Sequence, residues 1–230
     1  SFIAAIIGVI FILMMKKNIP LLLIFLTLGL FIYFNIQVVV DFAGRYIYPL
    51  DDAYIHLSMA KNFAEFQTWG ITQYEFSSTT SSPLFTFLLA ILIKVFGNWE
   101  YIPLVANTIA GIFLIWISHN YLKQFSKLTY TVFLVSIVLL MPLHLMIMTG
   151  MEHVFHALTM VLALLAFKKY LENEAPRNFS NLALLSILAT GFRYESLFFI
   201  FFMCVYLFFI KKEYFQSIAL GLFAMTPVLI

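Results

Sequence analysis

The sequence predicts an all-α fold, a polytopic bundle of transmembrane helices with a large external first loop that carries juxtamembrane helices. Hydrophobic residues make up 63% of the 230 residues, and only 10% are charged. A soluble domain of average composition has about a quarter charged residues. The apolar residues gather in runs of about 20, which is the length that a helix needs to cross a bilayer. Membrane lipid is therefore an expected partner, and a net charge of +2 gives no sign of a nucleic-acid partner.

Five apolar stretches define the predicted crossings. Four are long enough to cross once, with tilt where needed: Pro20 to Val40, Ile102 to Leu122, Leu128 to Met148, and Met151 to Phe167. The fifth, Leu182 to Ile210, is too long for one crossing. It contains an arginine and a glutamate, which would be costly in the middle of a bilayer. We therefore expect a hairpin whose tip is Arg193 to Glu195.

Both ends of the sequence suggest a longer protein. Ser1 is not an initiator residue, and the chain stops inside the apolar segment "LFAMTPVLI". The stretch "MMKKNIPLLLIFL" is typical of a natural start at Met14 or Met15, and residues 1–13 are either an extra helix or upstream sequence. We expect residues 1–230 to form a single transmembrane domain, the N-terminal part of a longer chain.

The basic residues predict the orientation, because cytoplasmic loops carry an excess of Lys and Arg. With the hairpin in place, most of them fall on one side, which is assigned to the cytoplasm: Lys16, Lys17, Lys123, Lys127, Lys168, Lys169, Arg177, Lys211 and Lys212. The opposite side receives most of the acids: Asp41, Asp51, Asp52, Glu65, Glu75, Glu100, Glu152 and Glu195. We expect a protein of the plasma (inner) membrane whose polar chemistry faces the periplasm or the cell exterior.

Residues 41–101 form the predicted external loop, and two short helices are expected within it. Asp52 to Phe66 places Ile55, Met59 and Phe63 four apart, the pattern of a helix that lies in the membrane interface. The second helix, Leu84 to Phe96, is apolar but too short to cross, so we expect a re-entrant or surface helix.

The adjacent acids Asp51 and Asp52 open the first of these helices. An aspartate in this position is a good N-cap, and a second acid in the first turn complements the helix dipole. Capping is compatible with catalysis, since a carboxylate at the mouth of a membrane cavity can accept a proton from a hydroxyl or orient a metal ion. Both interpretations remain open from the residues alone.

Three segments, taken in order, resemble the GT-C superfamily of integral membrane glycosyltransferases, in particular the arabinofuranosyltransferases and protein mannosyltransferases. "DDAYIHLSMAKNFAEFQTWGITQYEFSSTTSSPLFTFLLAILIKVFG" resembles the first external loop of that family, which opens with an acidic pair. "TGMEHVFHALTMVLALLAF" resembles its "SGMETxxF" segment, and "LLSILATGFRYESLFF" resembles "LLxLATxxRPExLxx". The matches extend over about two thirds of the chain, and their order and spacing make the case.

The resemblance implies an inverting transfer of a sugar from a polyprenyl-phosphate donor to a hydroxyl of a glycan, lipid or protein acceptor. In that scheme Asp51 is the general base and Asp52 supports it. Arg193 holds the lipid phosphate, and Glu195 and Glu152 match acids of the family pattern. Tyr194 departs from the family's Arg-Pro-Glu, which puts the local turn in doubt.

Other residues have competing interpretations. Arg193 and Glu195 also fit a simple ion pair that ties the hairpin together. Ser82 is a candidate sugar ligand in "EFSSTTSSPL", and equally the N-cap of a helix that Pro83 begins. His153 and His156, at a spacing of three, permit a metal site without demanding one. No cofactor is certain, and a divalent metal stays open.

The alternative function from another class is a transporter or flippase for a lipid or small solute. Transporters keep their ionisable residues near the middle of the membrane, often at broken helices. Here the acids gather in an external loop and at helix ends, which favours chemistry at the membrane surface.

Overall fold

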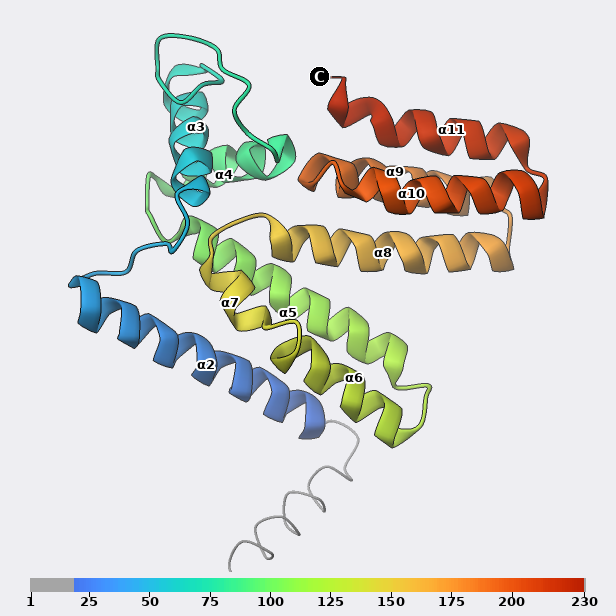
Figure 1. Cartoon of the computed structure of the whole chain (residues 1–230), viewed down its shortest axis with the longest axis horizontal. Coiled ribbons are helices and arrows are strands. Elements are labelled where there is room, and N and C mark those ends of the chain that lie inside the picture. Colours follow the sequence, from blue (N-terminus) through green and yellow to red (C-terminus); the bar gives the residue numbers. More distant parts are fainter. Residues whose placement is uncertain (1–18, 230) are drawn as a thin grey trace, which may run out of the picture.

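The structure, a computed structural model, describes residues 19–229, and helices are its regular elements over that range (Figure 1). In chain order they are α2 (Ile19–Ala43), α3 (Asp52–Phe66), α4 (Pro83–Phe96), α5 (Ile102–Leu122), α6 (Lys127–Leu139), α7 (Leu143–Met148), α8 (His153–Glu172), α9 (Pro176–Phe192), α10 (Ser196–Val205), η1 (Tyr206–Lys211), α11 (Tyr214–Met225) and η2 (Thr226–Val228). Lys16, Lys17 and the predicted start at Met14 or Met15 lie outside the described residues.

Four helical stretches between residues 19 and 229 are long and apolar enough to cross a membrane: Leu21–Ala43, Ile102–Leu122, Lys127–Met148 and His153–Glu172. They correspond to the four single crossings that the sequence predicts. Their length and composition indicate an integral membrane protein. The two helices expected between residues 41 and 101 are present as α3 and α4.

The third of these stretches is interrupted by Pro142. α6 ends at Leu139 and α7 begins at Leu143, so the apolar run from Leu128 to Met148 is two helices rather than one. Proline has no N–H to donate and its ring clashes with the preceding turn, which breaks a helix at this position. The N–H groups of Leu140 and Met141 both donate to the Ser136 carbonyl at the break.

The turn of the predicted hairpin is present at Arg193 to Glu195 between α9 and α10, and neither arm is among the four stretches long and apolar enough to cross. Its first arm begins at Pro176 rather than Leu182, and is longer than the apolar run indicates. Proline is favoured in the first turn of a helix, because its missing N–H has no partner there in any case. The second arm continues from α10 through the π-helical segment η1 to Lys211.

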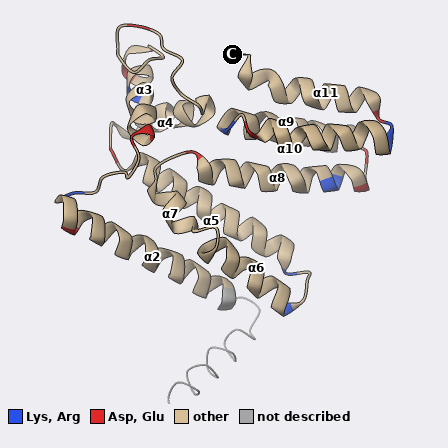
Figure 2. Cartoon of the chain, in the orientation of Figure 1, with Lys and Arg blue, Asp and Glu red and all other residues tan. Residues whose placement is uncertain are grey.

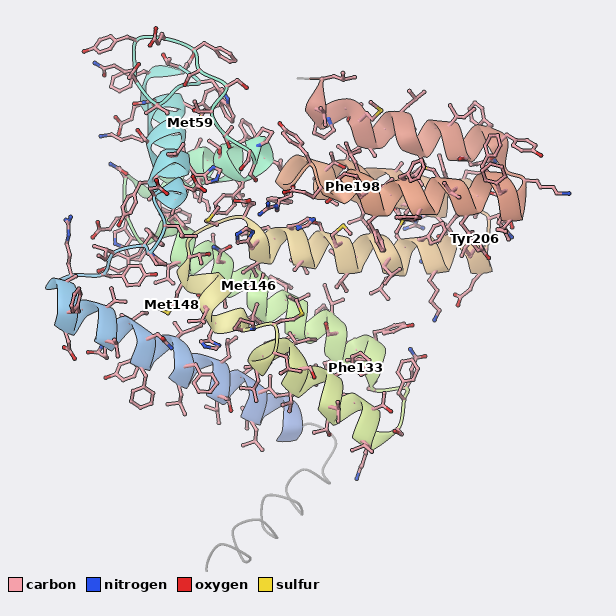
Figure 3. The ribbon with its side chains drawn as sticks, in the orientation of Figure 1. Met59, Phe133, Met146, Met148, Phe198 and Tyr206 are labelled. Atoms are coloured by element: carbon pink, nitrogen blue, oxygen red, sulfur yellow. The ribbon has the colours of Figure 1, made fainter. Side chains whose placement is uncertain are left out.

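The helices form two groups that meet where α5 packs on α8 (Figure 1). In one group, α2, α5, α6 and α7 bury a cluster that includes Leu28, Leu114, Leu134 and Ile147. In the other, α8 to α11 bury a cluster that includes Leu182, Ile200 and Leu220. Large apolar side chains such as Phe133 and Phe198 stay exposed on the outside of the bundle, as expected for surfaces that face lipid (Figure 3).

The helices α3 and α4 pack against each other at one end of this bundle. Met59 of α3, which is labelled in Figure 3, and Phe85 of α4 are fully buried. A third apolar cluster joins Phe85 and Leu89 to Ile102 at the start of α5 and Phe192 at the end of α9. The α3–α4 pair is thereby fixed to the same end of the bundle as the tip of the hairpin.

Most of the basic residues gather at one end of the bundle (Figure 2). At one end, which we call the basic end, lie Lys123, Lys127, Lys168, Lys169, Arg177, Lys211 and Lys212, at the termini of α5, α6, α8, α9 and η1. The opposite end carries α3, α4, the start of α8 and the α9–α10 turn. This division agrees with the sorting of basic residues that the sequence predicts.

Two tyrosines secure the segment between α2 and α3. The Tyr46 hydroxyl donates to the Met148 carbonyl at 2.7 Å, and the Tyr48 hydroxyl donates to the Glu100 carbonyl at 2.7 Å. Gly150, in the turn between α7 and α8, has φ +70°, and a Cβ there would lie 2.4 Å from the Tyr48 ring. The turn that leads into α8 therefore needs glycine for its conformation and for the space that the tyrosine takes.

Gly150→Ala is expected to destabilise the protein by about 1–3 kcal/mol, because alanine is strained at this φ and displaces Tyr48. The melting temperature in detergent measures the effect. Gly29→Ala is the matched control, since a Cβ at this α2 position meets nothing within 4 Å and alanine favours a helix. Equal melting temperatures for the two variants would contradict the packing argument.

Candidate functional site

The carboxylate of Glu152 is the centre of the candidate site. Glu152 immediately precedes α8 and is 0% exposed. Its Oε1 lies 3.2 Å from Nη1 of Arg193, and its Oε2 lies 3.4 Å from Nε2 of His56. Neither oxygen makes a hydrogen bond of good geometry with a described residue. The carboxylate is thus held mainly by charge, between α3 on one side and the α9–α10 turn on the other.

The guanidinium of Arg193 has partners both in the interior and at the surface. Nη1 faces inward, 2.7 Å from Nδ1 of His153, while Nε and Nη2 form a fork on the carboxylate of Glu195. Because a guanidinium only donates, Nδ1 of His153 must accept, so this imidazole is neutral. The Glu195 side chain is 57% exposed, against 25% for Arg193 and 1% for Glu152. Nε and Nη2 of Arg193 therefore bind the Glu195 carboxylate, which is exposed enough to move into solvent.

His56 connects the buried carboxylate to α4. Its Nδ1 lies 2.8 Å from the Thr86 hydroxyl and 3.2 Å from the Thr80 hydroxyl, and these hydroxyls lie 2.9 Å apart. We call the continuous series Thr80, Thr86, His56, Glu152, Arg193 and Glu195 the polar chain. It joins α3, the start of α4, the start of α8 and the α9–α10 turn.

Local structure explains why these side chains converge. The buried face of α3 contains Ala53, His56 and Ala60, so the small neighbours leave room for the imidazole to reach inward. The Asn107 amide of α5 donates to the Met151 carbonyl at 2.8 Å, which fixes the residue before Glu152. Arg193 ends α9 with an extended backbone, and this turns its side chain back toward α8.

Both acids of the polar chain that lie beside Arg193 are ionised. Burial favours the protonated form of Glu152, but the contact with the His56 side chain outweighs it and holds the pKa of Glu152 below its ordinary value. The hydrogen bonds from Arg193 lower the pKa of Glu195 to about 2. The site thus holds two carboxylates and one guanidinium in close contact.

The acid pair opens α3 as predicted, and both residues are exposed. Asp51 is the N-cap: its Oδ1 accepts from the Asp52 N–H at 3.1 Å, and its carbonyl accepts from Tyr54 and Ile55. Asp52 lies one helical turn before His56, which contacts Glu152. The acid pair and Arg193 therefore lie at the same end of the bundle, connected through α3 and the buried carboxylate.

Ser82 occupies the predicted N-cap position of α4, but its side chain bonds a different helix. Ser82 precedes α4, and Pro83 begins that helix as expected, but the Ser82 side chain makes no capping hydrogen bond. Its hydroxyl is buried and donates to the Phe192 carbonyl at 2.7 Å. Ser82 is therefore the N-cap residue of α4, as predicted, but its hydroxyl bonds a carbonyl at the end of α9 instead of a backbone N–H of α4.

The two histidines at the start of α8 have separate partners. His153 contacts Arg193, whereas Nε2 of His156 lies 2.8 Å from the Ser196 hydroxyl on α10. Among residues 19–229, no group of three or more His, Cys, Asp or Glu side chains is arranged to hold a metal ion. The spacing of these histidines reflects contacts with the α9–α10 turn.

Sequence reasoning did not assign His56 or the threonines to the site. The predicted apolar face of α3 was Ile55, Met59 and Phe63, whereas the structure buries Ala53, His56, Met59, Ala60 and Asn62. A histidine in line with two alanines on one face of a helix was the available signal. Thr86, within the apolar run of α4, gave no comparable signal.

Comparison with protein-family models, with curated proteins and with solved structures gave no match for this chain.

The Arg193–Glu195 pair predicts a pH dependence of stability. Because the pKa of Glu195 falls from 4.5 to about 2 on folding, the pair stabilises the protein above pH 4.5, and this contribution is lost as the pH falls toward 2. In melting experiments, Glu195→Gln should lower the melting temperature slightly at neutral pH, and the difference from wild type should shrink in acid. The effect is small because the carboxylate is largely solvated.

The control for this pH series is Glu65→Gln on α3. Glu65 is exposed and has no ion pair among the residues that the structure describes. A difference for Glu195→Gln that stays constant from neutral to acid pH would show that the pair does not stabilise the fold.

Proposed function

We propose that this chain belongs to a membrane glycosyltransferase that moves a sugar from a polyprenyl-phosphate donor to an acceptor hydroxyl, with inversion, on the extracytoplasmic face. One observation carries the proposal. The exposed pair Asp51 and Asp52 lies at the same end of the bundle as Arg193, whose Nε and Nη2 face outward. The buried carboxylate of Glu152 connects Arg193 to His56 on α3, the helix that the acid pair opens. The order of the three resembling segments, the first of which opens with this acid pair, supports the same activity.

The orientation supports an extracytoplasmic site. The basic end of the bundle is the cytoplasmic one by the positive-inside rule. The polar chain, α3 and α4 then lie on the periplasmic or external side of the plasma membrane. The exposed apolar residues Phe87, Ile91 and Val95 follow one face of α4 at a spacing of four, as suits a helix that lies in the outer membrane interface.

Asp51 serves as the general base. As the acceptor oxygen forms a bond to the anomeric carbon, the bond from that carbon to the donor phosphate breaks, and the polyprenyl phosphate leaves with the electron pair. The hydroxyl proton passes to the Asp51 carboxylate, which is exposed and so accessible to an acceptor from the aqueous side. A single displacement of this kind inverts the configuration at the anomeric carbon. Asp52 orients the acceptor beside it.

Arg193 serves as the phosphate ligand. A guanidinium binds a phosphate through two parallel N–H donors, as it binds a carboxylate, so we expect the donor phosphate to replace the Glu195 carboxylate on Arg193. Glu195 is exposed and can swing away, whereas Glu152 and His153 keep the inward nitrogen fixed. The guanidinium is therefore held in place before the donor binds, which reduces the cost of ordering it.

The transporter alternative has less support. Ionisable residues that move a substrate through a membrane lie near the middle of the bundle. The polar chain instead lies where α3, α8 and α10 begin, and the helical breaks at Pro142 and η1 carry no acidic residue.

Asp51→Asn is expected to lower sugar transfer by roughly a hundredfold or more, because the amide cannot take the hydroxyl proton. The assay is transfer of sugar from a polyprenyl-phosphate sugar to the acceptor in membranes that contain the protein. Asp41→Asn, another exposed acid at the same end, is the control and should retain activity. Full activity of a folded Asp51→Asn variant would remove Asp51 from the role of base.

Arg193→Lys is expected to weaken donor binding about tenfold, because a single ammonium replaces a two-pronged contact with phosphate. The lysine keeps the positive charge beside Glu152, so the fold should be preserved. Equilibrium binding of polyprenyl phosphate to the purified protein measures the change, with the exposed Arg45→Lys as the matched control. Unchanged affinity would leave Arg193 as a purely structural partner of Glu195.

A further inference from the structure

A groove of about 380 Å³ lies between α8 and α9, away from the polar chain. Leu165 and Lys169 of α8 and Asn178, Asn181, Leu184 and Leu185 of α9 line it. The two helices are antiparallel and joined by a short turn after Glu172, so Lys169 and Asn178 lie near the turn and the leucines lie deeper. The groove thus has a polar mouth at the basic end and an apolar interior.

The mouth of the groove is positively charged and not neutralised. The two acids of the α8–α9 turn are already engaged: Glu172 pairs with Lys168, and Glu174 pairs with Lys211. Lys169 and Arg177 are exposed, and the structure gives neither an ion-pair partner within residues 19–229. Arg177 lies one turn before Asn181 on α9, so both side chains reach the same side of the helix.

Polar groups at the mouth add hydrogen-bond donors. The Asn178 amide donates to the Asn173 carbonyl, which fixes the turn, whereas the exposed Asn181 amide has no partner among the described residues. α9 also begins at this point without a side-chain cap and without an acid in its first turn. The N-terminal end of a helix favours an anion, so it adds to the attraction of Lys169 and Arg177.

The interior of the groove suits a hydrocarbon chain. Leu162 and Lys169 are seven residues apart on α8, so the groove extends about 10 Å along the helix from its mouth. Leu184, on the opposite wall, is 55% exposed. A groove with an apolar interior and a cationic mouth suits the upper part of one acyl chain next to its headgroup.

We propose that this groove binds an anionic glycerophospholipid from the leaflet at the basic end. Lys169, Arg177 and Asn181 contact the headgroup phosphate, and one acyl chain lies along Leu165, Leu184 and Leu185. The charges make the site selective for anionic over zwitterionic lipid. The site is separate from the polar chain and does not depend on the proposed transfer reaction.

The charge of the mouth is tested with the whole protein in nanodiscs of phosphatidylcholine that contain a spin-labelled or fluorescent phosphatidylglycerol. Lys169→Gln with Arg177→Gln should weaken phosphatidylglycerol binding roughly thirty-fold, since each cation near the surface contributes to the attraction of an anionic headgroup. The matched control is Lys123→Gln with Lys212→Gln, which removes the same charge from the same end but outside the groove. It should change binding no more than about twofold.

The shape of the groove is tested by a substitution that leaves the charge unchanged. Leu184→Trp should fill the apolar channel and displace the lipid, and folding should be preserved because the side chain is half exposed. Leu164→Trp, equally exposed on α8 but not lining the groove, should bind lipid as the wild type does. Soluble glycerophosphate should not compete, because it lacks the acyl chain.

Three results would overturn the proposal. Equal losses in the two double variants would show general attraction to a charged surface. Equal binding of phosphatidylcholine and phosphatidylglycerol would show an apolar crevice without headgroup recognition. Competition by glycerophosphate would show a site for free phosphate rather than for a lipid.

Discussion

A buried, ionised carboxylate needs partners that offset its loss of hydration. Glu152 is such a carboxylate, and the end of the bundle that carries α3, α4 and the α9–α10 turn supplies its partners. Taking an ionised carboxylate out of water costs several kcal/mol, and removal of one partner from a buried pair costs about 3–5 kcal/mol. Glu152 is fully buried, and its compensation comes from His56 on α3 and Arg193 after α9. Three segments that are distant in the sequence are therefore held together by one charge.

The remaining contacts of this end keep that charge in place. The threonines of the polar chain fix the second nitrogen of His56, so α4 is tied to α3 by hydrogen bonds as well as by apolar packing. Tyr46 and Tyr48 hold the segment before Asp51 against the turns that precede α5 and α8. The exposed acid pair is consequently supported by rigid packing, which the proposed role of Asp51 as general base would require for a productive geometry.

The ionised side chains differ in burial and in pairing between the two ends of the bundle. At the end that carries α3 and α4, Arg193 contacts both Glu152 and Glu195, and Glu152 and Arg193 are fully or partly buried. Electrostatic interactions are strong in such surroundings. At the basic end Glu172 and Glu174 form exposed pairs with Lys168 and Lys211, and Lys169 and Arg177 stay exposed without an ion pair among the described residues. The first arrangement suits the proposed transfer reaction, and the second suits the proposed binding of an anionic lipid.

The sequence by itself determined the membrane class, the positions of the long helices, the hairpin tip and the two helices between residues 41 and 101. These features follow from local properties, namely the length of an apolar run, the cost of charge in a bilayer, and the preference of Pro and Asp for helix starts. Only the tertiary structure decided which residues meet Glu152, that the Ser82 hydroxyl bonds the Phe192 carbonyl, and that His153 and His156 have separate partners. Those contacts join residues up to 110 positions apart, and no local pattern specifies how the helices are rotated against each other when they pack.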